Sequence, residues 1–208
     1  MVLLHNSQQN QDSNLPKAFV LGNGTSRSGI DLNNLKKHGT IYGCNALYRE
    51  YSPDHLIAVD GKMILEIVDS GYHFKNLVWS NPTATTNKIS NLNLINPNLG
   101  WSSGPTALHL ASLHGYDEIY ILGFDYIGLG NSNELVNNIY ADTRNYKKAN
   151  ERATYYSNWL RQTATCINQH QKVKYYRITN NSAFLPRELT ELQNLFHMEK
   201  EKFLELFK

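Results

Sequence analysis

The stretch Lys17-Ala18-Phe19-Val20-Leu21-Gly22-Asn23-Gly24-Thr25-Ser26-Arg27 decides the fold of this chain. It opens with an apolar run typical of a buried strand and continues into a turn that holds two glycines. Asp31 then caps a short helix, and Gly39 ends it. A strand that leads through a tight turn into a helix is the repeating unit of α/β proteins, so this stretch predicts that class.

The alternation continues along the chain. Further strands are expected at residues 40–43, 55–59, 77–79, 118–122 and 173–178, and an edge strand within 89–95. Helices are expected at 62–69, 103–115 and about 143–169, the last either continuous or interrupted near Thr154. Residues 127–140 form a Gly/Asn-rich loop, long enough to be a lid. We predict one Rossmann-like α/β domain over residues 17–208, with a mostly parallel sheet, helices on both faces and a C-terminal amphipathic helix from about residue 188. Residues 1–16 are predicted to be a flexible polar leader.

Composition limits the classes of function. The 208 residues carry a net charge of +2, so the composition implies no strong electrostatic attraction to nucleic acid or to membranes. The chain shows no signal peptide and no apolar run of the ~20 residues that span a bilayer, and we expect a cytoplasmic protein. Cys44 and Cys166 lack metal-ligand spacing and the eight histidines are scattered, so the sequence predicts reduced thiols and no metal site.

A second glycine turn, Trp101-Ser102-Ser103-Gly104-Pro105-Thr106-Ala107, precedes an apolar, helix-like run. Glycine lets the backbone approach a ligand closely, and a helix N-terminus offers unpaired N–H groups that attract phosphate. Two such turns indicate a nucleotide or nucleotide sugar held by its phosphates. The alternative interpretation is that both are ordinary strand-to-helix turns.

Polar residues also collect where strands end or the next helix starts. In parallel sheets ligands bind beyond the carboxyl ends of the strands, so we expect these side chains to share one rim. Each also has a local explanation, because Asp and Asn cap helices and stabilise turns. The set comprises Asn23, Thr25, Ser26, Asn45, Asp60, Ser103, Thr106, Asp125 and Tyr126.

These residues resemble a known set. Gly22-Asn23-Gly24-Thr25-Ser26 resembles the phosphate loop of bacterial sialyltransferases of the Campylobacter type, glycosyltransferase family 42, with Thr25 in place of a proline. Cys44-Asn45, Ser103-Gly104 and the segment 114–126 are similar to further elements of that family. The same signals occur in motility-associated glycosyltransferases and MptE-like pterin pyrophosphokinases, and the chain most resembles small proteins of tailed bacteriophages. The resemblance covers residues 17–180 and implies a host-cytoplasmic enzyme.

Two departures separate the chain from the sialyltransferases. The family has a catalytic histidine after its lid tyrosine, and residues 153–159 here contain none. The family's phosphate-binding tyrosine corresponds to Ile127, with Tyr126 offset by one position. The family's acceptor chemistry is therefore not carried over.

The first functional hypothesis is a metal-independent glycosyltransferase without a cofactor. Asn45 and Asp60 would bind base and ribose, Tyr126 and Tyr140 would donate to the departing phosphate, Arg27 and Arg144 would supply positive charge, and Asp125 or Asp142 would be the base. The two turns would hold the phosphate with Gly22, Asn23, Gly24, Thr25, Ser26, Ser103, Gly104 and Thr106.

Two other hypotheses remain open. A phosphotransfer enzyme similar to the pyrophosphokinases would bind Mg²⁺ through Asp60 and Asp125. A protein that binds a nucleotide without catalysis would keep the pocket and lack the family histidine. In either case the partner is a small nucleotide ligand. The apolar set of residues 188–207 predicts that this segment packs on the domain or on a second copy as a homo-oligomer.

Overall fold

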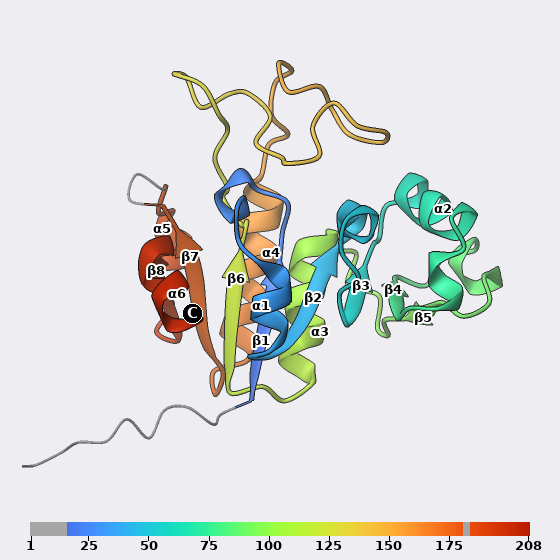
Figure 1. The fold of residues 1–208 in the computed structure, drawn as a ribbon, viewed down its shortest axis with the longest axis horizontal. Coiled ribbons are helices and arrows are strands. Elements are labelled where there is room, and N and C mark those ends of the chain that lie inside the picture. Colours follow the sequence, from blue (N-terminus) through green and yellow to red (C-terminus); the bar gives the residue numbers. More distant parts are fainter. Residues whose placement is uncertain (1–15, 181–183) are drawn as a thin grey trace, which may run out of the picture.

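The computed structural model describes residues 16–180 and 184–208, and the leader expected at residues 1–16 lies outside them except for Pro16. The described chain forms one sheet of eight parallel strands with helices on both faces, which confirms the predicted α/β class (Figure 1). The strand order is β5-β4-β3-β2-β1-β6-β7-β8. The chain therefore winds outward from β1 to β5, returns to the centre, and winds outward again on the other side.

The strands are β1 (Lys17–Leu21), β2 (Thr40–Cys44), β3 (His55–Ile57), β4 (Val78–Ser80), β5 (Asn93–Leu94), β6 (Glu118–Leu122), β7 (Lys174–Thr179) and β8 (Leu195–Glu199). The α-helices are α1 (Leu32–Lys36), α2 (Gly61–Asp69), α3 (Ser103–Leu113), α4 (Ser157–Gln169), α5 (Arg187–Thr190) and α6 (Lys200–Leu206). The 3₁₀ turns are η1 (Thr25–Arg27), η2 (Asn45–Arg49), η3 (Tyr72–Phe74) and η4 (Thr86–Lys88).

The core lies on both faces of the sheet, because successive side chains of a strand point to opposite sides. Ala18 and Val20 of β1 pack with residues of α3 and α4, whereas Phe19 and Leu21 pack with residues of α1, α2 and α6. A strand covered on both faces must be apolar throughout, which explains the unbroken run that opens the chain. The strand order reverses between β1 and β6, and ligands bind at such a switch point in open α/β sheets.

The helix expected over residues 143–169 is wrong in its first half. Helix α4 begins only at Ser157, and the preceding residues continue the irregular segment that follows β6. Asp142 and Asn145 adopt left-handed backbone conformations, with φ of 67° each, which a helix does not tolerate. Residues 123–156 therefore form one long excursion, here called the β6–α4 loop, which rises above the carboxyl ends of the strands (Figure 1).

The long C-terminal helix expected from about residue 188 is also wrong. The segment divides into α5, β8 and α6, and β8 pairs in parallel with β7 from Leu195 to Glu199. Asn194 fixes this register, because its side-chain amide donates to the carbonyls of Ile167, His170 and Val173. The apolar residues at helical spacing thus serve two elements.

Helix α6 packs on the domain itself. Its residue Phe203 is fully buried, and Phe207 just after the helix is 6 % exposed. Both rings meet the ring of Phe19, at centroid distances of 6.2 and 5.1 Å. The apolar residues that suggested an interaction surface are therefore partly core residues, and the homo-oligomer stays a prediction. Among the described residues, no helix is long and apolar enough to cross a membrane.

Candidate functional site

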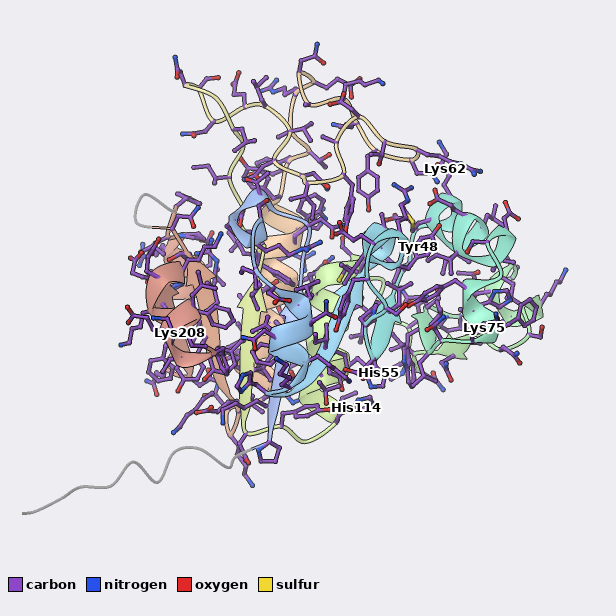
Figure 2. The ribbon with its side chains drawn as sticks, in the orientation of Figure 1. Tyr48, His55, Lys62, Lys75, His114 and Lys208 are labelled. Carbon is purple, nitrogen blue, oxygen red and sulfur yellow. The ribbon has the colours of Figure 1, made fainter. Side chains whose placement is uncertain are left out.

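A cavity of about 370 Å³ opens at the carboxyl edge of the sheet, between the strand ends, the start of α3 and the β6–α4 loop. The side chains of the loop project above this edge, with Lys62 beside them at the start of α2 (Figure 2). The cavity has the size of ordinary small-molecule sites. Nine of the residues predicted from the sequence line it: Gly22, Asn23, Gly24, Asn45, Asp60, Ser103, Gly104, Asp125 and Tyr126.

The glycines of the first turn serve contact between two loops. A Cβ on Gly22 would lie 2.6 Å from the carbonyl oxygen of Gly123, and a Cβ on Gly24 would lie 2.7 Å from the same oxygen. Gly24 N–H donates to that carbonyl over 2.9 Å. Backbone approaches this close exclude any side chain. The need for glycine here therefore arises from packing between the loops after β1 and β6.

Four backbone N–H groups of the first turn, those of Gly22, Gly24, Thr25 and Ser26, already donate inside the protein. Thr25 N–H donates to the side-chain oxygen of Asn137 over 2.9 Å, and Ser26 N–H donates to the Asp125 carboxylate over 3.1 Å. The Ser26 hydroxyl donates to the second oxygen of that carboxylate. A protein carboxylate thus occupies the position at η1 where the sequence suggested a phosphate, so this turn offers no open cradle in the described conformation.

The second turn differs at Ser103 and Gly104, where the start of α3 borders the cavity. Helix α3 has Ser102 at its N-cap, without a side-chain capping bond. Ser103 and Gly104 line the cavity, and their N–H groups are among those that lack intrahelical partners at any helix start. Neither of these two N–H groups donates a hydrogen bond to another described residue. The positive end of α3 therefore faces the cavity and is suited to a phosphate.

Asn45 stands beside this helix start in a strained conformation. Its φ is 53°, and its side-chain oxygen accepts a 2.8 Å hydrogen bond from the Ser103 hydroxyl. That hydroxyl also accepts the N–H of Val59 over 3.1 Å. The amide nitrogen of Asn45 remains to donate into the cavity. Left-handed non-glycine residues of this kind gather at functional sites.

Asp60 supplies a carboxylate that lines the cavity and is exposed. It occupies the N-cap of α2 without making a side-chain capping bond. No hydrogen bond or ion pair within the described residues engages this carboxylate. Asp60 is therefore the acidic group of the cavity that is free to bind or to accept a proton, in contrast to Asp125.

The hydroxyl groups of the two predicted tyrosines, Tyr126 and Tyr140, both donate hydrogen bonds inside the protein. The hydroxyl of Tyr126 donates to Thr163 Oγ1 over 2.6 Å, and that of Tyr140 donates to Glu50 over 2.5 Å and accepts from Arg27 over 2.9 Å. Tyr126 lines the cavity, whereas Tyr140 does not. Both protons are committed inside the protein, so neither hydroxyl is set to serve a leaving group.

Tyr146 is one of the two cavity tyrosines, with Tyr156, that the sequence reasoning missed. It lines the cavity, and its hydroxyl accepts from the side-chain amide of Asn23 over 3.2 Å and from Ala46 N–H over 3.4 Å. A phenol has two acceptor positions and one proton, so its own proton is free to donate into the cavity. Burial raises the pKa of Tyr146, which keeps the hydroxyl protonated. The residue lies in the segment expected to be helical, and only its lack of apolar periodicity indicated a loop.

The remaining predicted residues lie away from the cavity wall. Arg27 is buried and its guanidinium donates to the carbonyl of Gly22, and Thr106 donates to the carbonyl of Trp101. Asp142 accepts the N–H of Ala149. Those that do not line the cavity are Thr25, Ser26, Arg27, Thr106, Tyr140, Asp142 and Arg144.

An ion pair between η2 and α2 anchors the β6–α4 loop. The Arg49 guanidinium binds the Glu66 carboxylate over 2.6 Å, and it also donates to Thr143 Oγ1 and to the carbonyl of Arg144. Burial works against the charge on Glu66, but hydrogen bonds from Tyr48, Arg49 and Asn145 hold its pKa below the ordinary value. These contacts hold the loop that carries Tyr146 and Lys147, the lysine of the cavity wall.

Comparisons with protein-family models, curated proteins and solved structures find no match for this chain.

Proposed function

We propose that this protein is a metal-independent transferase that uses a nucleotide sugar as donor, in the manner that its resemblance to the Campylobacter-type sialyltransferases implies. One observation carries the proposal: the uncapped start of α3 faces a cavity of about 370 Å³ at the switch point of the sheet. A phosphate at Ser103 and Gly104 would accept hydrogen bonds from their N–H groups. Such a donor also fits the cytoplasmic setting, in a phage-infected host, expected from the sequence.

The leaving phosphate gains charge as the sugar departs, so a donor aimed at it accelerates the reaction. Tyr146 fits this role better than Tyr126 or Tyr140, because its proton is uncommitted. Lys147 supplies positive charge from the same loop. Asp60 is the carboxylate left to bind the ribose or to take the proton of the acceptor.

The Mg²⁺-dependent alternative uses the carboxylates of Asp60 and Asp125 as ligands. Asp60 is free for this role, but both oxygens of Asp125 accept hydrogen bonds from Ser26. Freeing Asp125 would leave the N–H of Ser26 without its partner. The observation favours transfer without a metal over phosphotransfer that uses one.

A thermal-shift screen of nucleotides and nucleotide sugars, with and without Mg²⁺, tests binding, since a ligand of the folded state raises the melting temperature. The best donor is then used to measure turnover for Tyr146→Phe and for Tyr140→Phe as the matched control. Tyr146→Phe is expected to lower turnover roughly 10²-fold with little change in donor affinity. Tyr140→Phe is expected to change stability and to leave turnover near that of the wild type.

Three outcomes contradict parts of the proposal. If no nucleotide shifts the melting temperature, the cavity is not a nucleotide-binding site. Binding without any hydrolysis or transfer identifies a nucleotide-binding protein instead of an enzyme. Turnover that requires Mg²⁺ restores the phosphotransfer alternative.

A further inference from the structure

A second cluster of chemical groups lies away from the cavity, between α3 and α4. His109 comes from α3, Cys166 from α4, and His170 is the C-cap residue of α4. One ligand atom from each of the three side chains lies within 4.8 Å of the other two. None of the three residues lines the cavity. Residue spacing does not indicate this cluster, because His109 is distant in the chain from the other two.

The fold brings the three side chains together for simple reasons. Cys166 and His170 are four residues apart, so they lie on the same side of α4. Helices α3 and α4 run side by side on one face of the sheet, which places His109 opposite them (Figure 1). The rings of His109 and His170 have centroids 5.6 Å apart, and Trp101 packs edge-on against His109 at 5.7 Å.

Two buried nitrogens in this cluster have no hydrogen-bond partner among the described residues. They are Nδ1 of His109 and Nε2 of His170. A buried nitrogen left without a hydrogen-bond partner destabilises the folded state, so such atoms call for an explanation. Cys166 is fully buried, and its sulfur makes a 3.8 Å contact with the Ser112 hydroxyl. Two unpaired imidazole nitrogens beside a thiol form a set of metal ligands.

We propose that His109, Cys166 and His170 bind one Zn²⁺ or a similar borderline-soft divalent ion. Two imidazoles and one thiolate are the ligand types that Zn²⁺ prefers, and three protein ligands leave the fourth tetrahedral position to water. Cys166 binds as the thiolate, and its proton passes to solvent. Bond lengths of about 2.0–2.3 Å put the ligand atoms about 3.4–3.7 Å apart, so separations of up to 4.8 Å shorten by at most about 1.4 Å on binding.

The ion would clamp the two helices that stand behind the cavity. The start of α3 already contacts α4, because Ser102 N–H donates to the Gln162 side chain over 3.1 Å. Metal at the other end of this contact would fix how α3 is held against α4. In this role the ion holds the two helices together, and the role does not depend on the proposed transfer reaction.

Cobalt substitution tests the site in the untagged full chain. Co²⁺ bound by a thiolate in tetrahedral geometry gives a sulfur-to-metal charge-transfer band and intense visible bands. We expect one Co²⁺ per chain, displaced by Zn²⁺, and a higher melting temperature with Zn²⁺. Cys166→Ser is expected to abolish the charge-transfer band and His170→Gln to weaken binding at least tenfold.

Cys44→Ser is the matched control, because Cys44 is the other buried cysteine and lies apart from the cluster. It is expected to keep the wild-type spectrum and Zn²⁺ response. Far-ultraviolet circular dichroism checks that each variant folds without metal, and His109→Gln replaces any variant that does not. A wild-type chain that gives no cobalt spectrum and no Zn²⁺ shift overturns the proposal, as does a Cys166→Ser variant that keeps the charge-transfer band.

Discussion

Gly24→Ala should destabilise the fold even though the backbone at this position suits alanine. Gly24 has φ of −65°, but a Cβ there would lie 2.5 Å from Asp125 Cγ and 2.7 Å from the Gly123 carbonyl oxygen. The carboxylate must move by about 1 Å, at an overpacking cost of about 1–3 kcal/mol. Its displacement also weakens charge-assisted bonds to Ser26. We expect a loss of about 2–4 kcal/mol in the free energy of unfolding.

Urea unfolding followed by circular dichroism measures this loss. Gly61→Ala is the control, because nothing lies within 4 Å of its added Cβ, and it should leave stability unchanged or raise it by about 0.5–1 kcal/mol. In an Asp125→Ala background, Gly24→Ala should cost at least about 1 kcal/mol less, since the main obstacle is gone. A Gly24→Ala variant within about 0.5 kcal/mol of wild type refutes the loop-packing argument.

Two further changes test other parts of the fold. Asn194→Ala should lower the free energy of unfolding by about 1–3 kcal/mol, because three carbonyls at the end of α4 and before β7 lose their donor. A denaturation midpoint equal to that of the wild type would contradict this prediction. Burial and the nearby His114 hold the pKa of the His55 imidazole, which accepts from Trp79 at the amino end of the sheet, at about 4 (Figure 2). The unfolded chain binds this proton nearer pH 6.5, so stability should fall as the pH drops from 6.5 to 4, and His55→Asn should reduce that fall in pH-dependent melting.

The strand pattern was predictable because each central strand is buried on both faces. β6 runs from Glu118 to Leu122 as expected, and β1 from Lys17 to Leu21. The β6–α4 loop and the C-terminal segment were not predictable to the same degree. Leu195 and Phe203 fit one helical stripe by spacing, yet β7 offers a free edge that pairs with the first of them. Local periodicity contains no information about such an edge.

The position of the site could be predicted from the sequence, but the hydrogen bonds of its side chains could not. Strand ends in a parallel sheet meet at one edge, so the polar residues that follow strands were bound to gather near one another. Their hydrogen-bond partners come from the β6–α4 loop, which periodicity does not describe. Asn137 satisfies Thr25, and Asn23 donates to Tyr146. The choice between Tyr140 and Tyr146 therefore depended on which hydroxyl had already committed its proton.

Glycine in a turn has two physical causes that the sequence cannot separate. A ligand that approaches the backbone and a second loop that packs against it both exclude a Cβ. At Gly24 the second cause operates, since Asp125 and Gly123 fill the space. At Gly104 the nearest neighbour of an added Cβ is the Phe124 ring at 3.2 Å, while Gly104 lines the cavity and its N–H has no acceptor among the described residues. The two turns differ in whether their N–H groups already have acceptors inside the protein. A phosphate would therefore bind at the start of α3 and not at the first glycine turn.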